Sequence, residues 1–508
     1  MNILSAFKDL LNRYKYLLMP LLSGILLITA FPPFDQGYVA WFALLPLLAT
    51  CLQVTPLRAF RAGFIFGIPL HFYLNFYLAN VLFTYLPFSL AIAAMIGLVL
   101  YISLFYGLFG LAAGLVNRLG KNWLTAFAVP CLWLLAEYLR SLSFLAYNVG
   151  YLGYTQWGYS TLLNITAVYG YWGLPFLIVF FQVILLQFYL KKLQGIILYA
   201  VSAVFILLLT AGLLLPNLYP VSKDKEKLWV GLIQGNIDPE QIVDSSREQI
   251  LQRYLDLTRY AVEAEPSVNL VVWPETVVEL NFTVDQSHPP LMIETAEELG
   301  VSFLYGARLR KNDQLYNAIT FYNVKQDEIP VYKKHRLVPF VEYFPLEQVL
   351  NQFLQLDLLL GRYSAGKEVT VFDFDGIKFG GAVCFESYFG DHTRLFAAKG
   401  SRHLFILTND AWFGESIGLE QHAQAAAIRA AEMGTGVTQV ANSGITISFD
   451  YRGRELFRSG KNEAAYFTIP LDLKTRSTIY KNFGDYFPAA CALFLLISIP
   501  LIRFRKTI

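Results

Sequence analysis

Apolar residues are spread very unevenly along this chain of 508 residues, and this unevenness limits its possible folds more than any motif does. Nearly every residue from Tyr16 to Pro216 is apolar, aromatic or small, whereas Val221 to Asn482 alternates as a soluble protein does. One more apolar run, Ala489–Ile502, follows. Because a helix needs roughly 20 apolar residues to cross a bilayer, the pattern predicts a helical membrane protein with a large soluble domain inserted before its last span.

This distribution predicts three regions with defined limits. We expect a transmembrane domain of about seven helices over residues 1–220, a soluble α/β domain over 221–482, and a last transmembrane helix with a short tail over 483–508. The runs expected to span the membrane are Tyr16–Phe31, Tyr38–Gln53, Ala59–Tyr85, Phe88–Val116, Asn122–Tyr138, Thr161–Leu190, Gly195–Pro216 and Phe487–Ile502. The first two and the last fall below the usual lower limit of about 17 residues.

Positive charges fall in alternate loops between these runs. They are Lys8, Arg13, Lys15, Arg58, Arg61, Arg118, Lys121, Lys191, Lys192, Arg503, Arg505 and Lys506. Because Lys and Arg gather in cytoplasmic loops, both termini are predicted to be cytoplasmic and the soluble domain to lie outside the cytoplasm. Glu137 and Arg140 lie near the end of one run, where we interpret them as side chains that reach the membrane interface.

Charge and motif content exclude several classes of function. The formal net charge of +2 is too close to zero to indicate a nucleic-acid partner. The sequence offers no glycine-rich phosphate-binding motif, and no pair of histidines has the HExxH spacing of a zinc site. We therefore expect neither a cofactor nor a metal ion.

Strand-like and helix-like segments alternate in the soluble part, which is typical of a layered α/β domain. The expected strands are Leu228–Ile237, Asn269–Trp273, Ser302–Leu309, Asn317–Asn323, Val369–Phe374, Lys378–Cys384, Leu404–Thr408, Val437–Ala441 and Thr446–Phe449. The expected helices are Glu240–Ala264, Pro290–Leu299 and Gln421–Met433. Leu356–Leu360, "LDLLL", is equally compatible with a core segment and with an arm that dips into lipid.

Cys384 is the single cysteine of the soluble part, since Cys51, Cys131 and Cys491 lie in apolar runs. Residue type alone leaves two interpretations open, a small buried core residue and a nucleophile. Polar residues at the ends of expected strands favour a site: Glu275, Lys333, Lys334, Cys384, Asn409 and Asp410. A cysteine could attack there, a carboxylate could take its proton, and a lysine could stabilise the developing negative charge.

The sequence leaves open which residue is the base and what role Asn409 and Asp410 have. A histidine could replace the carboxylate as the base, and the soluble part holds His288, His335, His392, His403 and His422. For Asn409 and Asp410 we favour a structural role, in which their hydrogen bonds tie the end of a strand.

Several motifs together resemble the nitrilase superfamily and, over nearly the whole chain, the apolipoprotein N-acyltransferase family. They are "AFPPFD" at Ala30–Asp35, "NVGYLGYTQ" at Asn148–Gln156, "LVVWPET" at Leu270–Thr276, "YKKHRLVPFVEYFPLE" at Tyr332–Glu347, "CFES" at Cys384–Ser387, "TNDAWFGES" at Thr408–Ser416 and "QHAQAAAIRAAEMG" at Gln421–Gly434. The chain departs from the family pattern at Val341, where glycine is usual, and at Phe385, where tyrosine is frequent.

The resemblance implies a fold and a set of site residues. It implies a nitrilase-like α-β-β-α sandwich outside the cytoplasm, joined to a multispan helical domain. It assigns the base to Glu275, the lysine to Lys334 rather than Lys333, and the nucleophile to Cys384. The supporting residues that it implies are Glu342, Glu386, Asn317 and Phe385.

The resemblance also implies a reaction and a location. A phospholipid would donate its sn-1 acyl chain to Cys384, and the resulting thioester would acylate the amino terminus of a diacylated apolipoprotein. Such a protein is expected in the bacterial inner membrane, in contact with lipid, as a multi-pass monomer with its catalytic domain facing the periplasm. A membrane-tethered carbon–nitrogen hydrolase with the same three residues is one alternative. A transporter or sensor whose outer domain only binds is another, although polar residues spread through the spans or repeated halves would then be expected.

Overall fold

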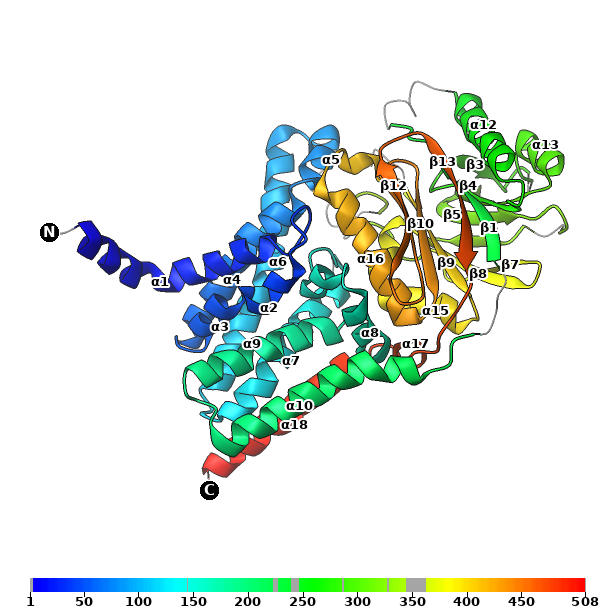
Figure 1. Cartoon of the computed structure of the whole chain (residues 1–508). Helices are drawn as coiled ribbons and strands as arrows, with labels where there is room; N and C mark the ends of the chain where they lie inside the picture. Colours follow the sequence, from blue (N-terminus) through cyan, green and yellow to red (C-terminus); the bar gives the residue numbers. More distant parts are fainter. Residues whose placement is uncertain are drawn as a thin grey trace. The chain divides into compact units, whose positions relative to one another are not determined.

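The computed structural model describes residues 3–143, 145–222, 227–238, 246–285, 287–326, 329–343 and 362–507. The chain divides into two compact units, one formed by Met1–Leu218 with Asp485–Ile508 and the other by Tyr219–Gly484 (Figure 1). The second unit contains the strands and helices expected for the soluble part. The segment Leu356–Leu360, with its two interpretations, lies outside the described residues.

The first unit is helical. Its α-helices are α1 (Ile3–Ile28), α2 (Ala40–Ala43), α3 (Leu45–Cys51), α4 (Pro56–Asn75), α5 (Leu78–Tyr85), α6 (Phe88–Asn117), α7 (Asn122–Leu142), α8 (Ser160–Tyr169), α9 (Gly173–Tyr189), α10 (Gly195–Leu214) and α18 (Tyr486–Thr507). Among the described residues, two helical segments, Phe88–Asn117 and Gly195–Leu218, are long and apolar enough to cross a membrane, or up to four if each of two bent pairs is one span.

Two of the runs expected to span the membrane are each formed by two helices that meet at a sharp bend. Ala59–Tyr85 is divided between α4 and α5, which meet at 67°, and Thr161–Leu190 between α8 and α9, which meet at 106°. The second break has a backbone cause, because Gly170 has a φ of +68° and ends α8.

The expected span Tyr38–Gln53 is also interrupted, between α2 and α3. The Leu44 amide donates to the Gln182 side chain, and the Leu47 amide donates to the Ser23 hydroxyl. Pro46 follows the break and has no amide proton to continue the helical ladder. Side chains of neighbouring helices thus satisfy donors that a continuous helix would have used.

The interpretation of Glu137 and Arg140 as interfacial side chains was wrong, because both are buried inside the helical unit. The Glu137 carboxylate accepts hydrogen bonds from the Trp133 indole, the Leu152 amide and the Tyr171 hydroxyl. The Arg140 guanidinium donates to the Val149 carbonyl and lies 4.0 Å over the ring of Tyr151. The two charges of α7 therefore fix the loop that carries the "NVGYLG" residues.

Among the described residues of the second unit, the strands form two sheets. The seven-stranded sheet has the order β13-β1-β2-β4-β5-β6, with β3 paired to β4, and the six-stranded sheet has the order β12-β11-β10-β9-β8-β7. Their bounds are β1 Lys227–Gln234, β2 Leu270–Val272, β3 Val278–Asn281, β4 Ser302–Lys311, β5 Gln314–Tyr322, β6 Val331–Lys333, β7 Val371–Phe374, β8 Ile377–Val383, β9 His403–Thr408, β10 Gly436–Ala441, β11 Ile445–Phe449, β12 Glu455–Lys461 and β13 Ala465–Asp472.

The two sheets contact each other, β1 against β10 and β5 against β8. Helix α12 (Arg247–Ala264) packs on β1 and β13 and contacts α13 (Pro290–Leu299), whereas α15 (Gly390–Ala398) and α16 (Ile417–Met433) pack on the other sheet (Figure 1). The α16 helix is rich in alanine, and nearly all of its residues are buried, because small side chains let it lie close to β10 and β11.

Parallel pairing brings several strand ends to one region. Strands β8, β9 and β10 run parallel in one sheet, and β1, β2 and β4 run parallel in the other. The strands predicted from the sequence are confirmed, with bounds that differ by a few residues. Their carboxyl ends carry Cys384, Asn409 and Glu275, as expected for a site in an α/β fold.

Candidate active site

Lys334 lies at the centre of a buried group of charges. It directly follows β6, and its amide donates to the carbonyl of Asn317 in the adjacent strand β5. Its Nζ lies 2.9 Å from Glu342 Oε2 and 3.8 Å from Glu275 Oε1. Only 1% of the Lys334 side chain is exposed, so these two carboxylates are what makes a buried ammonium group tolerable.

The pKa values in this group follow from burial and from the charges themselves. Burial raises the pKa of Glu275, and Lys334 opposes this increase. Burial would lower the pKa of Lys334, but the Glu342 and Glu275 carboxylates outweigh it and raise that pKa above its ordinary value. Lys334 is therefore a permanent positive charge, and Glu275 is a carboxylate that accepts a proton more readily than an exposed one.

Asn317 links the two carboxylates. Its side-chain nitrogen Nδ2 donates to Glu275 Oε1 at 2.7 Å and to Glu342 Oε1 at 2.8 Å. The other Glu275 oxygen, Oε2, accepts a hydrogen bond of 2.9 Å from the Asn409 amide at the end of β9. The carboxylate of Glu275 is thus oriented from both sheets.

Cys384 occupies a strained turn between β8 and the short 3₁₀ helix η4 (Cys384–Tyr388). Its φ is +49°, a left-handed conformation that costs a residue with a Cβ roughly 1–3 kcal/mol. The turn follows directly after the largely buried strand β8. Such geometry presents a side chain at the edge of a sheet, and it persists only where the surroundings hold it.

Glu386 ties this turn to the strand that carries the lysine. Its Oε2 accepts from the Val383 amide at 2.8 Å, while Oε1 accepts from the Tyr332 hydroxyl and the His335 amide, both at 2.7 Å. The Arg336 amide donates to the same oxygen. One fully buried carboxylate therefore fixes the position of the Cys384 turn relative to the segment that follows β6.

The Cys384 thiol is electrostatically coupled to the charges described above. Desolvation raises the pKa of Cys384 well above its ordinary value, the Glu275 charge raises it further, and the Lys334 charge lowers it. A thiol of this kind is protonated at neutral pH. It needs a base that takes its proton as it attacks.

Three other residues singled out from the sequence, Lys333, Phe385 and Val341, have different contacts or conformations from those that the sequence suggested. The Nζ of Lys333 lies 3.9 Å over the ring of Tyr316, so the neighbouring lysines have different surroundings. Phe385 packs edge-on against Phe389. Val341 does not have the positive φ that would require glycine, since the left-handed residue of this loop is Phe340.

The histidines left open as alternative bases have other partners. His403 bonds to the hydroxyl of Thr438, His288 to that of Tyr305, and His392 to that of Tyr332. His335 Nε2 bonds to the Glu368 carbonyl. His422, in contrast, lies close to Cys384.

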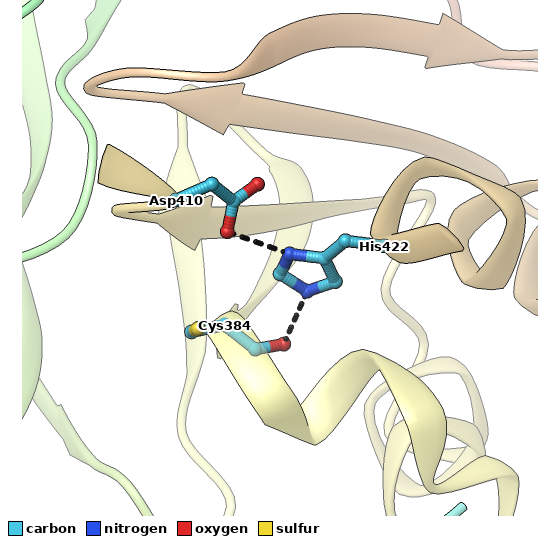
Figure 2. Close-up of side chains that lie close together, drawn as sticks. All are labelled: Cys384, Asp410 and His422. Atoms are coloured by element: carbon cyan, nitrogen blue, oxygen red, sulfur yellow. Dashed lines mark hydrogen bonds and ion pairs between the residues drawn. The ribbon is translucent and has the colours of Figure 1, made fainter. Parts of the chain in front are cut away.

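Cys384, Asp410 and His422 lie together, each with one possible metal-ligating atom within 4.8 Å of the others (Figure 2). His422 Nδ1 bonds to Asp410 Oδ1 at 2.8 Å, and Nε2 lies 3.1 Å from both the Cys384 carbonyl and the Ser387 hydroxyl. Both ring nitrogens therefore already have hydrogen-bond partners. While the ring donates to both Asp410 Oδ1 and the Cys384 carbonyl, neither nitrogen offers a lone pair to a metal ion or to the thiol proton, so this arrangement differs from a metal site and from a papain-like pair.

Sequence reasoning missed this histidine–aspartate pair, and it assigned Asn409 and Asp410 only to tying a strand end. Little in the sequence indicates that these two residues form a pair. His422 is a single histidine on an alanine-rich helix, and Asp410 follows a strand by two residues. Only the fold brings β9, α16 and the Cys384 turn together.

The fold and the site define a class: a carbon–nitrogen hydrolase domain joined to an apolar helical unit. Residues 229–480 match the carbon-nitrogen hydrolase family, and residues 23–184 match the apolipoprotein N-acyltransferase N-terminal domain. The apolipoprotein N-acyltransferase of Geobacter metallireducens is 31% identical, over 98% of this chain and 97% of that protein.

Other relatives have the same name. Apolipoprotein N-acyltransferase 1 of Treponema denticola is 26% identical over 97% of both chains. The apolipoprotein N-acyltransferase of Chlorobaculum tepidum is 25% identical over 96% of both chains. The chain belongs to the apolipoprotein N-acyltransferase family.

Proposed function

We propose that this protein transfers a fatty acyl chain from the sn-1 position of a phospholipid to the N-terminal amino group of a diacylglyceryl-cysteine on a lipoprotein. The observation that carries the proposal is the buried Glu275–Lys334–Glu342 group beside a cysteine in a strained turn. Family membership supplies the two lipid substrates. No cofactor takes part in the proposed reaction.

The first half-reaction loads the enzyme. The Cys384 sulfur attacks the ester carbonyl while Glu275 takes the thiol proton, since the raised pKa of the thiol leaves little thiolate beforehand. The tetrahedral oxyanion is stabilised by the positive charge of Lys334. The carbon–oxygen bond then breaks, Glu275 returns the proton to the leaving oxygen, and a lysophospholipid departs from a thioester on Cys384.

The second half-reaction repeats this chemistry with a different nucleophile. The lipoprotein amine attacks the thioester carbonyl and gives a proton to Glu275. The carbon–sulfur bond breaks, and the thiol recovers its proton. A triacylated lipoprotein leaves, and the enzyme returns to its starting state.

Supporting roles follow from contacts. Glu342 balances the Lys334 charge, Asn317 orients Glu275 and Glu342, and Glu386 holds the nucleophile turn. Phe385 is a supporting residue by resemblance only, and its aromatic contacts are consistent with a packing role. Water must be kept from the thioester, because hydrolysis competes with transfer.

The proposal extends to the setting of the reaction. We place the protein in the bacterial inner membrane as a multi-pass monomer with the α-β-β-α catalytic domain, residues 221–482, in the periplasm. The transmembrane domain is 1–220, and the last span lies in 483–508. Both substrates are lipids, so a catalytic domain attached to membrane helices meets them where they reside.

A transfer assay tests the proposal. Purified protein is given a phospholipid labelled in its sn-1 chain and a diacylated lipopeptide, and we expect label in the lipopeptide. Cys384→Ala should abolish transfer without loss of the fold. If the label appears as free fatty acid at the same rate with and without lipopeptide, the protein is instead a hydrolase of the same triad.

A further inference from the structure

The nucleophile turn is held from two sides. On one side, Glu386 accepts from the amide of Val383, the residue before Cys384. On the other side, His422 Nε2 lies 3.1 Å from the Cys384 carbonyl oxygen. A left-handed cysteine needs such support, because its preferred backbone conformation lies elsewhere.

The His422 ring is fixed in position by buried partners. Asp410 Oδ1 bonds to Nδ1, and the Thr408 hydroxyl donates to the same Asp410 oxygen at 2.8 Å. The ring also stacks on Tyr388, with the centroids 5.6 Å apart and the planes 13° from parallel. Figure 2 shows the imidazole between the carboxylate and the Cys384 carbonyl.

The number of protons on the ring decides which of these bonds can form. Asp410 Oδ1 and the Cys384 carbonyl are both acceptors, so an imidazole that bonds to both must donate through Nδ1 and Nε2. Only the doubly protonated, charged ring does this. A neutral ring keeps one donor and loses one of the two bonds; if Nε2 is the unprotonated nitrogen, it can accept only from the Ser387 hydroxyl, 3.1 Å away, and no longer holds the Cys384 carbonyl.

We propose that His422 and Asp410 form a positioning pair, in which the charged imidazole holds the Cys384 carbonyl and so keeps the nucleophile turn in its attacking geometry. This inference rests on the proposed role of Cys384 as nucleophile. His422 does not touch the reacting atoms, and it acts through the backbone of Cys384.

The titratable groups that face His422 are consistent with a charged ring. They are Asp410 after β9, Cys384 and Tyr388 in η4, and Glu275 after β2. Burial would lower the pKa of His422, but Asp410, the Cys384 carbonyl and Glu275 outweigh it and raise the pKa above its ordinary value. As pH rises through this raised pKa, the ring loses a proton and the support of the turn is lost.

Three variants of the full-length protein test the pair. His422→Phe keeps a ring but has no donor. His422→Gln can donate to the Cys384 carbonyl from an amide that does not titrate, and Asp410→Asn removes the charge that favours the protonated ring. His403→Gln, a change at a buried histidine that bonds to Thr438 instead, is the matched control.

Two rates are measured for each variant over a range of pH. One is the formation of the acyl adduct on Cys384 with phospholipid alone, followed by mass spectrometry. The other is the labelling of Cys384 by iodoacetamide, followed in the Cys384 peptide, which does not depend on any acyl transfer.

We expect His422→Phe to slow adduct formation about tenfold to a hundredfold, the effect of losing a hydrogen bond to a charged group. His422→Gln should recover most of the rate and remove the decline at alkaline pH that the wild type shows. Asp410→Asn should move that decline to lower pH. The control should match the wild type in rate and profile.

Several results would contradict the proposed role of the His422–Asp410 pair. One is a His422→Phe rate within about twofold of the wild type at every pH, well below the loss of a charged hydrogen bond. Another is that the pH–rate profiles of His422→Gln and Asp410→Asn superpose on the wild-type profile. If His422→Phe does not fold, these two profiles are the test. If the wild type forms no adduct, the proposed function fails, and the iodoacetamide labelling rates alone test the His422–Asp410 pair. Equal labelling rates of folded His422→Phe and His422→Gln would then contradict the proposed positioning role.

Discussion

At the scale of single residues, Lys334 and Lys333 are neighbours in sequence with opposite surroundings. Lys334 is buried between two carboxylates, whereas Lys333 lies over an aromatic ring. In the sequence both lysines belong to one cluster of basic residues. Only the alignment of the segment Tyr332–Glu347 with the family motif distinguished Lys334 from Lys333. The distances give an independent physical reason to prefer Lys334 as the group that stabilises the oxyanion.

The matched pair Lys334→Met and Lys333→Met tests this assignment. Methionine keeps most of the side-chain volume and removes the charge. Loss of one oxyanion-stabilising group typically costs about a hundredfold to a thousandfold in rate, so Lys334→Met should lose at least that much acyl transfer. Lys333→Met should change the rate severalfold at most. The reverse ranking in the labelled-lipid assay would show that the register is wrong.

Glu275 gives a prediction about pH. In its proposed role as base Glu275 must be ionised, so activity should fall as pH decreases through its pKa, which burial raises above the ordinary value. The hydrogen bond from Asn317 lowers that pKa. Asn317→Ala should therefore move the acid limb of kcat/KM to higher pH, in addition to slowing the reaction. An acid limb that stays in place or moves to lower pH would contradict the role of Glu275 as base.

At the scale of helices and strands, alternation and buried runs predicted most of the second unit. Segments such as "LFILT" became β9 because they are apolar and short, and a buried parallel strand needs little else. Strands β12 and β13 were not predicted, because both are partly exposed. In addition, β12 carries three charged residues in "ELFRSGK" and lacks an apolar run.

The breaks in the apolar runs could not be predicted in the same way. Whether a run becomes one helix or two depends on partners from other helices, as with Gln182 at the Leu44 amide. The same is true of Glu137 and Arg140, whose burial depends on partners such as Tyr171. A hydropathy profile averages the residues along one segment and contains no information about contacts between helices.

The link between β6 and the Cys384 turn gives a prediction about stability. Glu386 accepts four hydrogen bonds, and Tyr332→Phe removes only one of them. Tyr332→Phe should destabilise the protein by about 1 kcal/mol, and Glu386→Ala by about 3 kcal/mol or more, because buried amides lose their acceptor. Thermal unfolding followed by tryptophan fluorescence in detergent should rank the two variants in this order. Equal shifts would show that Glu386 does not link the two segments.

At the scale of the whole molecule, the sequence predicted a helical membrane part and a soluble catalytic part. The structure has a helical unit and a unit with two sheets, and the comparisons assign the chain to its family. The orientation in the membrane rests on the positions of lysine and arginine alone and stays a prediction. So does the number of spans.

Reporter fusions test the orientation. A periplasm-active reporter fused after Pro220 should be active, and one fused after Lys192 should be inactive, because basic loops stay in the cytoplasm. A cytoplasm-active reporter at the same two positions provides the complementary control. The opposite pattern would place the catalytic unit in the cytoplasm, away from the proposed lipoprotein substrate.

The proposed mechanism requires an acyl-enzyme on Cys384, and the intact mass of the protein after incubation with phospholipid alone shows whether this intermediate forms. We predict a mass increase of one fatty acyl group that maps to the Cys384 peptide and is absent in Cys384→Ala. Neutral hydroxylamine should remove it, and so should a diacylated lipopeptide with a free amino terminus, whereas an N-acetylated lipopeptide should not. If triacylated lipopeptide forms with both substrates present and no adduct ever forms with phospholipid alone, transfer is direct and the thioester mechanism is wrong.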